Sequence, residues 1–403
     1  GIMNQLYQSF SRKKKSMQYF FFILIFLFLP SIAQSAFLRN VPQVIKQPDG
    51  TTIHCYASGD EFYNWLHDEE GFTIIKNTKS GYWEYAIIEN DNLKPSGYVV
   101  GTVSPKDVKL VPWAILPEKR IKELKSTLGG GSPLFPKRIL SAPKTGTINN
   151  LVIFIRFSDE NEFTDLISDY DMMFNSDTPG DNSMYNYYDE VTYNQLEINT
   201  SFYPIPSGTT VISYQDAHPR GFYMPDSINP LGYADDNERT IREHTLLRDA
   251  IDDVKSSIPS SLDIDGDNDG YVDNICFIVS GSPNAWATLL WPHMWSLYTY
   301  DVFINGIQAY TYNFQLQSSL QSSGVGVLCH EMFHSLGAPD LYHYSYDGFT
   351  PVGPWDIMEW NRNPPQHMGA YMKYRYGEWI YTDLFGYVWK PHYSNYSINE
   401  FNK

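Results

Sequence analysis

The sequence predicts a mixed α/β fold, α+β in its N-terminal part, in which helices cover a twisted sheet. Residues 151–157 form a largely continuous apolar run, which is typical of a strand buried on both faces. Segments with a helical spacing of apolar residues alternate with such runs farther along the chain. The stretch 329–340 places two histidines four residues apart ahead of a glycine, so we expect a helix there that ends in a sharp turn.

The composition indicates a large globular protein with an export signal. The 403 residues are 42% hydrophobic and 16% aromatic, which suffices for a large core, and the net charge of −17 argues against nucleic acid as a partner. A basic run at 12–15 precedes a short apolar stretch at 19–29 and small residues up to Ala36. This pattern predicts a signal peptide at 1–36, because the apolar stretch is shorter than the roughly 20 residues of a membrane span. We expect a secreted, extracellular protein that has no membrane anchor after cleavage. The same signal is compatible with transit through a periplasm.

Residues 37–138 are predicted to form a small α+β propeptide. They contain strand-like runs and a helix N-cap signal at Asp60, which predicts a short helix from there to Leu66. They hold no complete metal or nucleophile set, and a glycine-rich break at 129–133 lies near their end. We place a linker at 139–148 and the catalytic domain at 149–403.

Two features of the predicted propeptide bear on latency. Its Cys55 is one of three cysteines, with Cys276 and Cys329. Three are too few for a disulfide framework and an odd count leaves at least one unpaired or intermolecular, so we expect burial as small hydrophobic residues. A Cys55 thiolate could instead block a metal, and the carboxylates of Asp60-Glu61 are at least as good as blockers. Lys137-Arg138 is either a processing site or part of a solvated loop.

Helices and a hairpin are predicted around the central strand. Residues 183–198 and 239–256 have helical spacing, and a further helix begins at Ala370. Asn305-Gly306 separates two short apolar runs, which predicts a two-residue β-hairpin at 302–310. We expect this hairpin to border the active-site cleft.

An acidic loop at 263–273 is a candidate calcium site. Asp265, Asp267, Asp269 and Asp273 occupy positions one, three, five and nine of an EF-hand-type loop, and calcium prefers such oxygen ligands. The loop is not a complete EF-hand, because the residue at position twelve is a cysteine and not the usual glutamate. The alternative is an Asp/Gly-rich solvated turn, whereas a bound calcium would be structural.

The predicted helix at 329–336 carries the candidate catalytic residues. His330 and His334 lie one turn apart on one face, where both imidazoles can reach one ion. Glu331 is rotated by about 100° from His330 and can reach a water on that ion. Gly337 ends the helix, so Asp340 can return as a third ligand. Three protein ligands and an open fourth position are what a catalytic zinc site requires.

Two other interpretations of this stretch are open. The helix could be an amphipathic core helix with two hydrogen-bonded histidines, although the spacing of Gly337 and Asp340 argues against it. The third ligand could instead be Glu359. It directly follows Met358 in what resembles a tight turn, so we expect its side chain to point away.

Residues 330–342 and the sequence Gly-Pro-Trp-Asp-Ile-Met at 353–358 resemble the immune inhibitor A-like family of secreted zinc metallopeptidases, which is related to the metzincins. The resemblance extends from about 43 to about 380. It implies a metzincin-like domain with Met358 in a turn beneath the metal, and an edge strand near the hairpin that pairs with an extended substrate. Some metzincins carry a tyrosine where this chain has Trp360, so the group that stabilises the oxyanion is unassigned.

Together these features predict a secreted zinc endopeptidase that is made as a zymogen and acts as a monomer on protein or peptide substrates. Glu331 would act as general base and then as general acid. Two alternatives are a secreted, non-catalytic zinc- and calcium-binding protein of the same fold, and a zinc hydrolase of a non-peptide bond.

Overall fold

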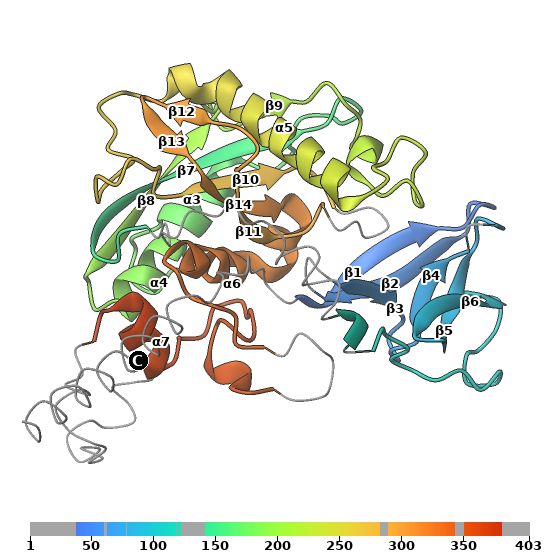
Figure 1. The fold of residues 1–403 in the computed structure, drawn as a ribbon. Helices are drawn as coiled ribbons and strands as arrows, with labels where there is room; N and C mark the ends of the chain where they lie inside the picture. The colour runs from blue at the N-terminus through green and yellow to red at the C-terminus, as the bar shows by residue number, and fades with distance from the viewer. Residues whose placement is uncertain are drawn as a thin grey trace, which may run out of the picture.

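The computed structural model describes residues 38–59, 63–77, 79–117, 119–121, 142–282, 289–342 and 350–380. The predicted signal peptide, the glycine-rich break, Lys137-Arg138 and Asp60-Glu61 lie outside these ranges. An N-terminal sheet stands beside a larger α/β body, as Figure 1 shows. No helix in the described ranges has the length and apolar character that a bilayer crossing requires.

The N-terminal unit is an antiparallel sheet whose strands pair in chain order. Its strands are β1 (Leu38–Lys46), β2 (Thr52–Gly59), β3 (Asn64–His67), β4 (Thr73–Lys76), β5 (Trp83–Glu89) and β6 (Asn92–Val99). The helix expected from Asp60 to Leu66 is wrong, because β3 pairs with β2 over part of that segment. Trp65 and Leu66 are both buried there, so tertiary packing overrides the local cap signal. Among the described residues of this unit, only 119–121 are helical.

The larger body is built on a six-stranded sheet, five strands of which follow the order β11-β14-β10-β7-β8. Its strands are β7 (Gly146–Arg156), β8 (Leu196–Tyr203), β10 (Ile275–Val279), β11 (His293–Ser296) and β14 (Thr311–Leu316), and the short β9 (Tyr214–Gln215) also pairs with β7. All pairings are parallel except that of β11 with β14, which makes β11 an antiparallel edge strand. The predicted central strand is confirmed as β7, which is buried on both faces. It begins at Gly146, inside the segment expected to be a linker.

Helices cover both faces of this sheet (Figure 1). One face carries α5 (Asp236–Val254) and the other carries α3 (Ile167–Asn175), α4 (Met184–Val191) and α6 (Gln317–Ser335). The remaining helical elements are η1 (Arg220–Tyr223), η2 (Lys255–Ser257), η3 (Gly353–Trp355), α7 (Ala370–Met372) and the π-helical turn η4 (Lys373–Gly377). This arrangement confirms the predicted fold class.

The helix expected at 183–198 is only half right. Ser183 caps α4 by accepting a 3.0 Å hydrogen bond from the amide of Asn186. The helix stops after Val191, because Tyr193 and Asn194 adopt positive φ angles of 60°. The residues that follow form β8, whose parallel pairing with β7 could not be read from local spacing.

The hairpin expected at 302–310 is present as β12 (Val302–Ile304) and β13 (Ile307–Ala309), joined by Asn305 and Gly306 at positive φ. Its expected place at the active-site cleft is wrong. Val302 and Ile304 are buried in the core on the α5 side, opposite the face that carries α6. The edge of the main sheet is formed by β11 instead.

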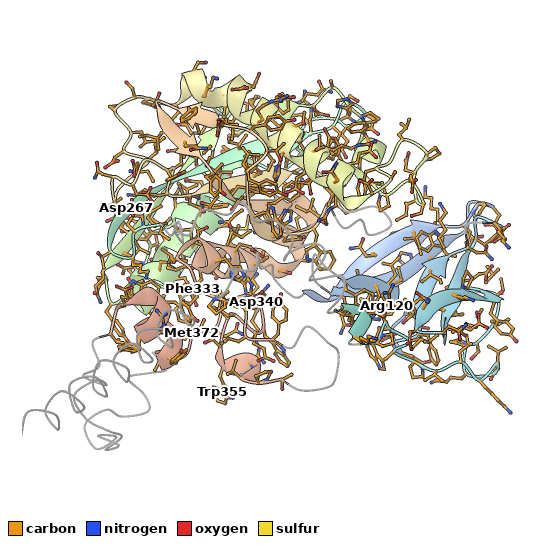
Figure 2. All side chains as sticks on the ribbon, in the orientation of Figure 1. Arg120, Asp267, Phe333, Asp340, Trp355 and Met372 are labelled. Atoms are coloured by element: carbon orange, nitrogen blue, oxygen red, sulfur yellow. The ribbon has the colours of Figure 1, made fainter. Side chains whose placement is uncertain are left out.

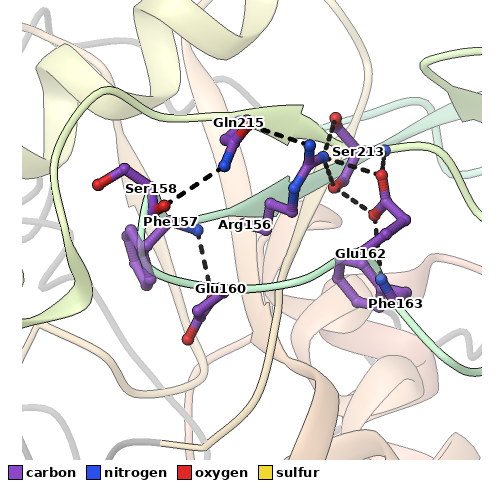
Figure 3. Close-up of polar contacts among 8 residues, drawn as sticks. All are labelled: Arg156, Phe157, Ser158, Glu160, Glu162, Phe163, Ser213 and Gln215. Carbon is purple, nitrogen blue, oxygen red and sulfur yellow. Dashed lines mark hydrogen bonds and ion pairs between the residues drawn. The ribbon is translucent and has the colours of Figure 1, made fainter.

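An ion-pair network holds the chain where it leaves β7, as Figure 3 shows. Arg156 donates from Nη1 to Glu162 Oε2 at 2.8 Å and to the Ser213 carbonyl at 2.9 Å. Glu162 in turn accepts the Ser213 hydroxyl at 2.6 Å. The loop before α3, which contains Glu162, and the loop after β8, which contains Ser213, are thereby tied to the end of the central strand.

Candidate metal centre

Helix α6 changes direction before it reaches the candidate ligands. Gly324 has φ 56° and ψ −140°, which are not helical angles, so the helix restarts after it. A Cβ on Gly326 would lie 1.9 Å from the carbonyl oxygen of Arg362. Glycine is therefore needed for the segment that follows Met358 to pack against the restarted helix.

Three side chains from α6 and the turn after it converge on one point. The Nε2 atoms of His330 and His334 lie 3.0 Å apart, and Asp340 Oδ1 lies 3.0 Å from the first and 3.3 Å from the second. Tetrahedral ligands at about 2.0–2.1 Å from a zinc ion would be about 3.3 Å from one another. All three side chains are buried, and Figure 2 shows Asp340 beneath α6, on the side away from α5.

The other ring nitrogen of each histidine is already engaged. His330 Nδ1 lies 2.9 Å from the carbonyl of Ile357, and His334 Nδ1 lies 2.8 Å from the carbonyl of Ala338. A carbonyl can only accept, so each Nδ1 donates and each neutral imidazole presents an Nε2 lone pair to its neighbours. Two lone pairs and a carboxylate oxygen therefore face one another, an arrangement that a shared cation stabilises. The donor set thus fits a divalent metal, with the carbonyls as supports.

The titratable side chains of this ligand group shift one another's pKa values. Burial alone would raise the pKa of Asp340, but the two imidazoles lower it to about 2. Burial alone would lower the pKa of His334, but Asp340 raises it above its usual value. The aspartate is therefore held as the anion that a metal ligand must be.

Asp340 reaches the histidines because the helix ends as the sequence predicts. Gly337 has φ 93°, and its amide donates a 2.8 Å hydrogen bond to the carbonyl of His334. Beyond the turn, the Leu341 amide donates to the Met358 carbonyl at 2.9 Å, which fixes the backbone next to Asp340.

Met358 lies in a tight, buried turn next to the ligand group. Asp356 organises that turn, because its Oδ1 accepts the Met358 amide at 2.8 Å and its Oδ2 accepts the Gly369 amide at 2.6 Å. Glu359 is also buried, but its Oε2 accepts the Val352 amide at 2.8 Å. Within the described ranges, the ligand group consists of His330, His334 and Asp340 and does not include Glu359.

Glu331 directly follows the ligand His330 in α6. Its side chain is fully buried and lines a small cavity against β10 and β14. Its charge contributes to the raised pKa of His334, after the larger effects of burial and Asp340. The carboxylate is thus within electrostatic reach of the ligands.

The acidic loop gathers three of the four expected carboxylates. Ligand atoms of Asp265, Asp267 and Asp269 lie within 4.8 Å of one another. Asp273 does not belong to that group, and its Oδ2 accepts the Gly266 amide at 3.0 Å. Burial and the neighbouring carboxylates raise the pKa of Asp273 to about 7, even against that hydrogen bond.

The three cysteines are buried free thiols, as expected. Burial raises the pKa of Cys55 to about 12, and its side chain faces the core of the N-terminal sheet. Burial also raises the pKa of Cys276 and Cys329. Cys55 does not belong to the described ligand group, so the thiolate alternative finds no support in the geometry.

Sequence analysis missed the residues that hold α6 in place. The Ser335 hydroxyl, next to His334, donates to Asn274 Oδ1 at 2.7 Å, and the Tyr188 hydroxyl donates to the Cys329 carbonyl at 2.6 Å. It also missed a buried ion pair between Glu243 and His293, with Nε2 and Oε1 2.8 Å apart. None of these residues has a local sequence signal, because their partners lie far along the chain.

The two histidines of the helix and the aspartate of the turn after it form a group that could hold a metal ion, as a metallopeptidase requires. Residues 258–371 match the family model of the immune inhibitor A peptidase M6, catalytic domain. The family resemblance seen in the sequence is confirmed over this stretch, which contains the acidic loop and the ligand group. A comparison with curated proteins finds no match.

Proposed function

We propose that this metallopeptidase is a zinc-dependent endopeptidase. The observation that carries the proposal is the convergence of His330 Nε2, His334 Nε2 and Asp340 Oδ1 within 3.3 Å of one another, with both Nδ1 atoms bound to carbonyls. Two imidazoles and one carboxylate suit zinc and leave a fourth position for a reactant. When bound, zinc would polarise the scissile carbonyl and activate water for attack.

The chain's own residues would orient that chemistry and move its protons. The carbonyls of Ile357 and Ala338 hold the imidazoles in the tautomer that ligates. Glu331, adjacent to the first ligand, would take a proton from the attacking water and later deliver it to the leaving amine. Met358 would support the ligand group through the backbone contact of its carbonyl with Leu341.

Casein cleavage by purified, processed protein tests this function. We expect cleavage, its loss when zinc is removed with a chelator, and its recovery when zinc is returned. A zinc-loaded protein that leaves casein intact but hydrolyses an ester or another non-peptide bond would favour the non-peptide hydrolase. Tight zinc binding without any hydrolysis would favour the non-catalytic binding protein.

We also propose that the chain is exported and made latent by its N-terminal unit. Export rests on the sequence pattern of residues 1–36. Latency is supported by an aromatic cluster, here called the latch, in which Tyr63, Trp65 and Ile121 of the N-terminal segment pack with Tyr342. Tyr342 is two residues past Asp340, so the N-terminal unit is anchored next to the ligand group.

Ring stacking and a hydrogen bond hold the latch residues in place. Tyr63 and Trp65 stack with ring centroids 5.6 Å apart, and the Tyr63 hydroxyl accepts the Leu116 amide at 2.8 Å. All four latch residues are at most 8% exposed. Separation of the N-terminal unit would expose this apolar surface, which favours the docked, latent state until the connection is cut.

Calcium is proposed as a structural ion of the acidic loop. Asp265, Asp267 and Asp269 supply three carboxylates around one point, and calcium takes six to eight oxygen ligands that carbonyls and water can complete. The loop leads directly into β10, so an ion there would stabilise the start of a central strand.

A further inference from the structure

A small internal cavity separates α6 from the face of the sheet that it covers. The volume in which the centre of a water molecule can lie is about 10 Å³. Its polar lining consists of Asn150, Asn274, Asn313, Gln315 and Glu331, from β7, β14 and α6 and from the residue before β10. Such a polar lining is unusual directly beneath a core helix, where apolar side chains pack most stably.

Most of the amides in this lining satisfy one another. Asn274 Nδ2 donates to Asn150 Oδ1 at 2.6 Å, and Asn150 Nδ2 donates to Thr200 Oγ1 at 3.0 Å. Asn313 Nδ2 donates to Asn274 Oδ1 at 2.9 Å. These bonds join the strands β7, β8 and β14 and the residue before β10 beneath the helix.

Gln315 is the exception. It is fully buried, and neither its Nε2 nor its Oε1 has a hydrogen-bond partner among the residues that the structure describes. The Oδ1 of Asn313, also buried, lacks a partner in the same ranges. A buried amide without a partner is costly, and native proteins usually provide such groups with an ordered water.

The cavity has the size and the polar groups for one such water. A site of about 10–15 Å³ with two to four polar partners is enough to hold a water molecule. Gln315 Nε2 can donate a hydrogen bond to this water. The water can in turn donate its two hydrogens to Asn313 Oδ1 and to the Glu331 carboxylate. All three bonds use groups that line this cavity.

Glu331 lines the cavity and directly follows the ligand His330 in α6. After burial, the charge of Glu331 is the cause that raises the pKa of Cys276, whose Cα pairs with that of Asn313 in the sheet. One carboxylate oxygen can therefore be held from the sheet side while the other serves the reaction.

We propose that Gln315 and Asn313 hold one internal water against Glu331, which makes Gln315 a positioning residue for the proton-transferring carboxylate. This inference rests on the proposed peptidase function. It explains why a glutamine stands at a fully buried position of a core strand, where an apolar residue would stabilise the fold more.

The test is Gln315→Met in the full chain, processed in the same way as wild type. Methionine keeps the length of the side chain and removes both polar atoms of the amide, so the melting temperature should stay or rise. We expect kcat to fall by about tenfold or more, while KM and zinc content stay unchanged. Gln315→Asn keeps an amide and should retain more activity than Gln315→Met. Gln321→Met, the same change at an exposed site on α6, serves as the matched control.

Three results overturn the inference. A Gln315→Met protein with wild-type kcat shows that the amide is not needed, and a fall in melting temperature or zinc content that parallels the loss of activity shows a structural role. A high-resolution crystal structure with an empty cavity excludes the water. If zinc-loaded wild type cleaves no peptide, the peptidase function fails by itself, and the crystal structure then decides whether the water exists.

Discussion

His330 Nδ1 donates a 2.9 Å hydrogen bond to the carbonyl of Ile357. This bond joins helix α6 to Ile357, 27 residues farther along the chain, in the turn that contains Met358. It also fixes the ring so that Nε2 faces His334 and Asp340. The turn after the ligand helix therefore contributes to the metal centre through its backbone.

Glu331→Gln should abolish peptide cleavage while zinc stays bound. The amide keeps the shape of the side chain and cannot accept the proton, and loss of a general base typically costs a factor of about 10²–10⁴ in rate. Casein cleavage and metal analysis on the same sample check this prediction. Retained proteolysis in a zinc-loaded variant would remove Glu331 from the mechanism.

The buried pair of Glu243 and His293 should make stability depend on pH. Burial alone would raise the pKa of Glu243, but His293 lowers it to about 2, whereas Glu243 raises the pKa of His293 despite burial. The contribution of His293 to the free energy of unfolding is complete below its unfolded pKa of about 6.5. It is lost as the pH rises through the higher pKa of the folded state. The contribution of Glu243 to the free energy of unfolding is complete above about pH 4.5 and is lost as the pH falls toward 2.

We therefore expect the free energy of unfolding contributed by this pair to be greatest between about pH 4.5 and 6.5 and to decline on the alkaline side. His293→Ala should remove that alkaline decline and destabilise the protein by roughly 3–5 kcal/mol, because it leaves a buried carboxylate without its partner. Urea unfolding at several pH values measures both effects. His218→Ala, at a side chain that is 45% exposed, should keep the decline. An unchanged profile in His293→Ala would show that the pair does not govern stability.

Calcium should raise the melting temperature of protein first stripped with a chelator. An ion that binds the folded loop alone stabilises by mass action, by about 1.4 kcal/mol at tenfold excess over its Kd. The double variant Asp267→Asn/Asp269→Asn should lose this shift. A melting curve that does not respond to millimolar calcium would count against a calcium site.

Trp65→Ala in the uncut precursor should raise its basal activity. The substitution removes the largest ring of the latch and so weakens the docking of the N-terminal unit beside Asp340. Tyr98→Ala changes an exposed aromatic residue on β6 and should leave the precursor latent. Precursor and processed protein are assayed side by side. A wild-type precursor that cleaves casein as fast as a form beginning near Asn149 would rule out latency.

The elements that could be predicted are those set by local chemistry. The ligand helix ends where Gly337 permits a left-handed backbone, and β7 follows from an apolar run that suits a strand buried on both faces. Helix α5 begins after Asp235, whose side chain accepts the Glu238 amide, close to its predicted start. In the candidate site, the histidine spacing and the returning aspartate carry similar local signals.

The elements that could not be predicted depend on partners distant in the chain. Trp65 joins a strand because β2 lies beside it, and the residues after Asn194 form β8 because β7 offers a parallel edge. The edge strand β11 depends on its antiparallel pairing with β14, which no local pattern reveals. Gln315 could not be identified either, since its role depends on Glu331 across the interface between helix and sheet.

The zinc content of an Asp340→Ala protein after mild dialysis tests the metal centre most directly. Loss of the one carboxylate in the ligand group should release the metal, while Glu359→Gln, at a carboxylate that accepts the Val352 amide, should retain about one zinc per chain. Wild type dialysed in parallel sets the reference. Zinc retained by Asp340→Ala and lost by Glu359→Gln would contradict the ligand group proposed here and assign the third position to the downstream glutamate.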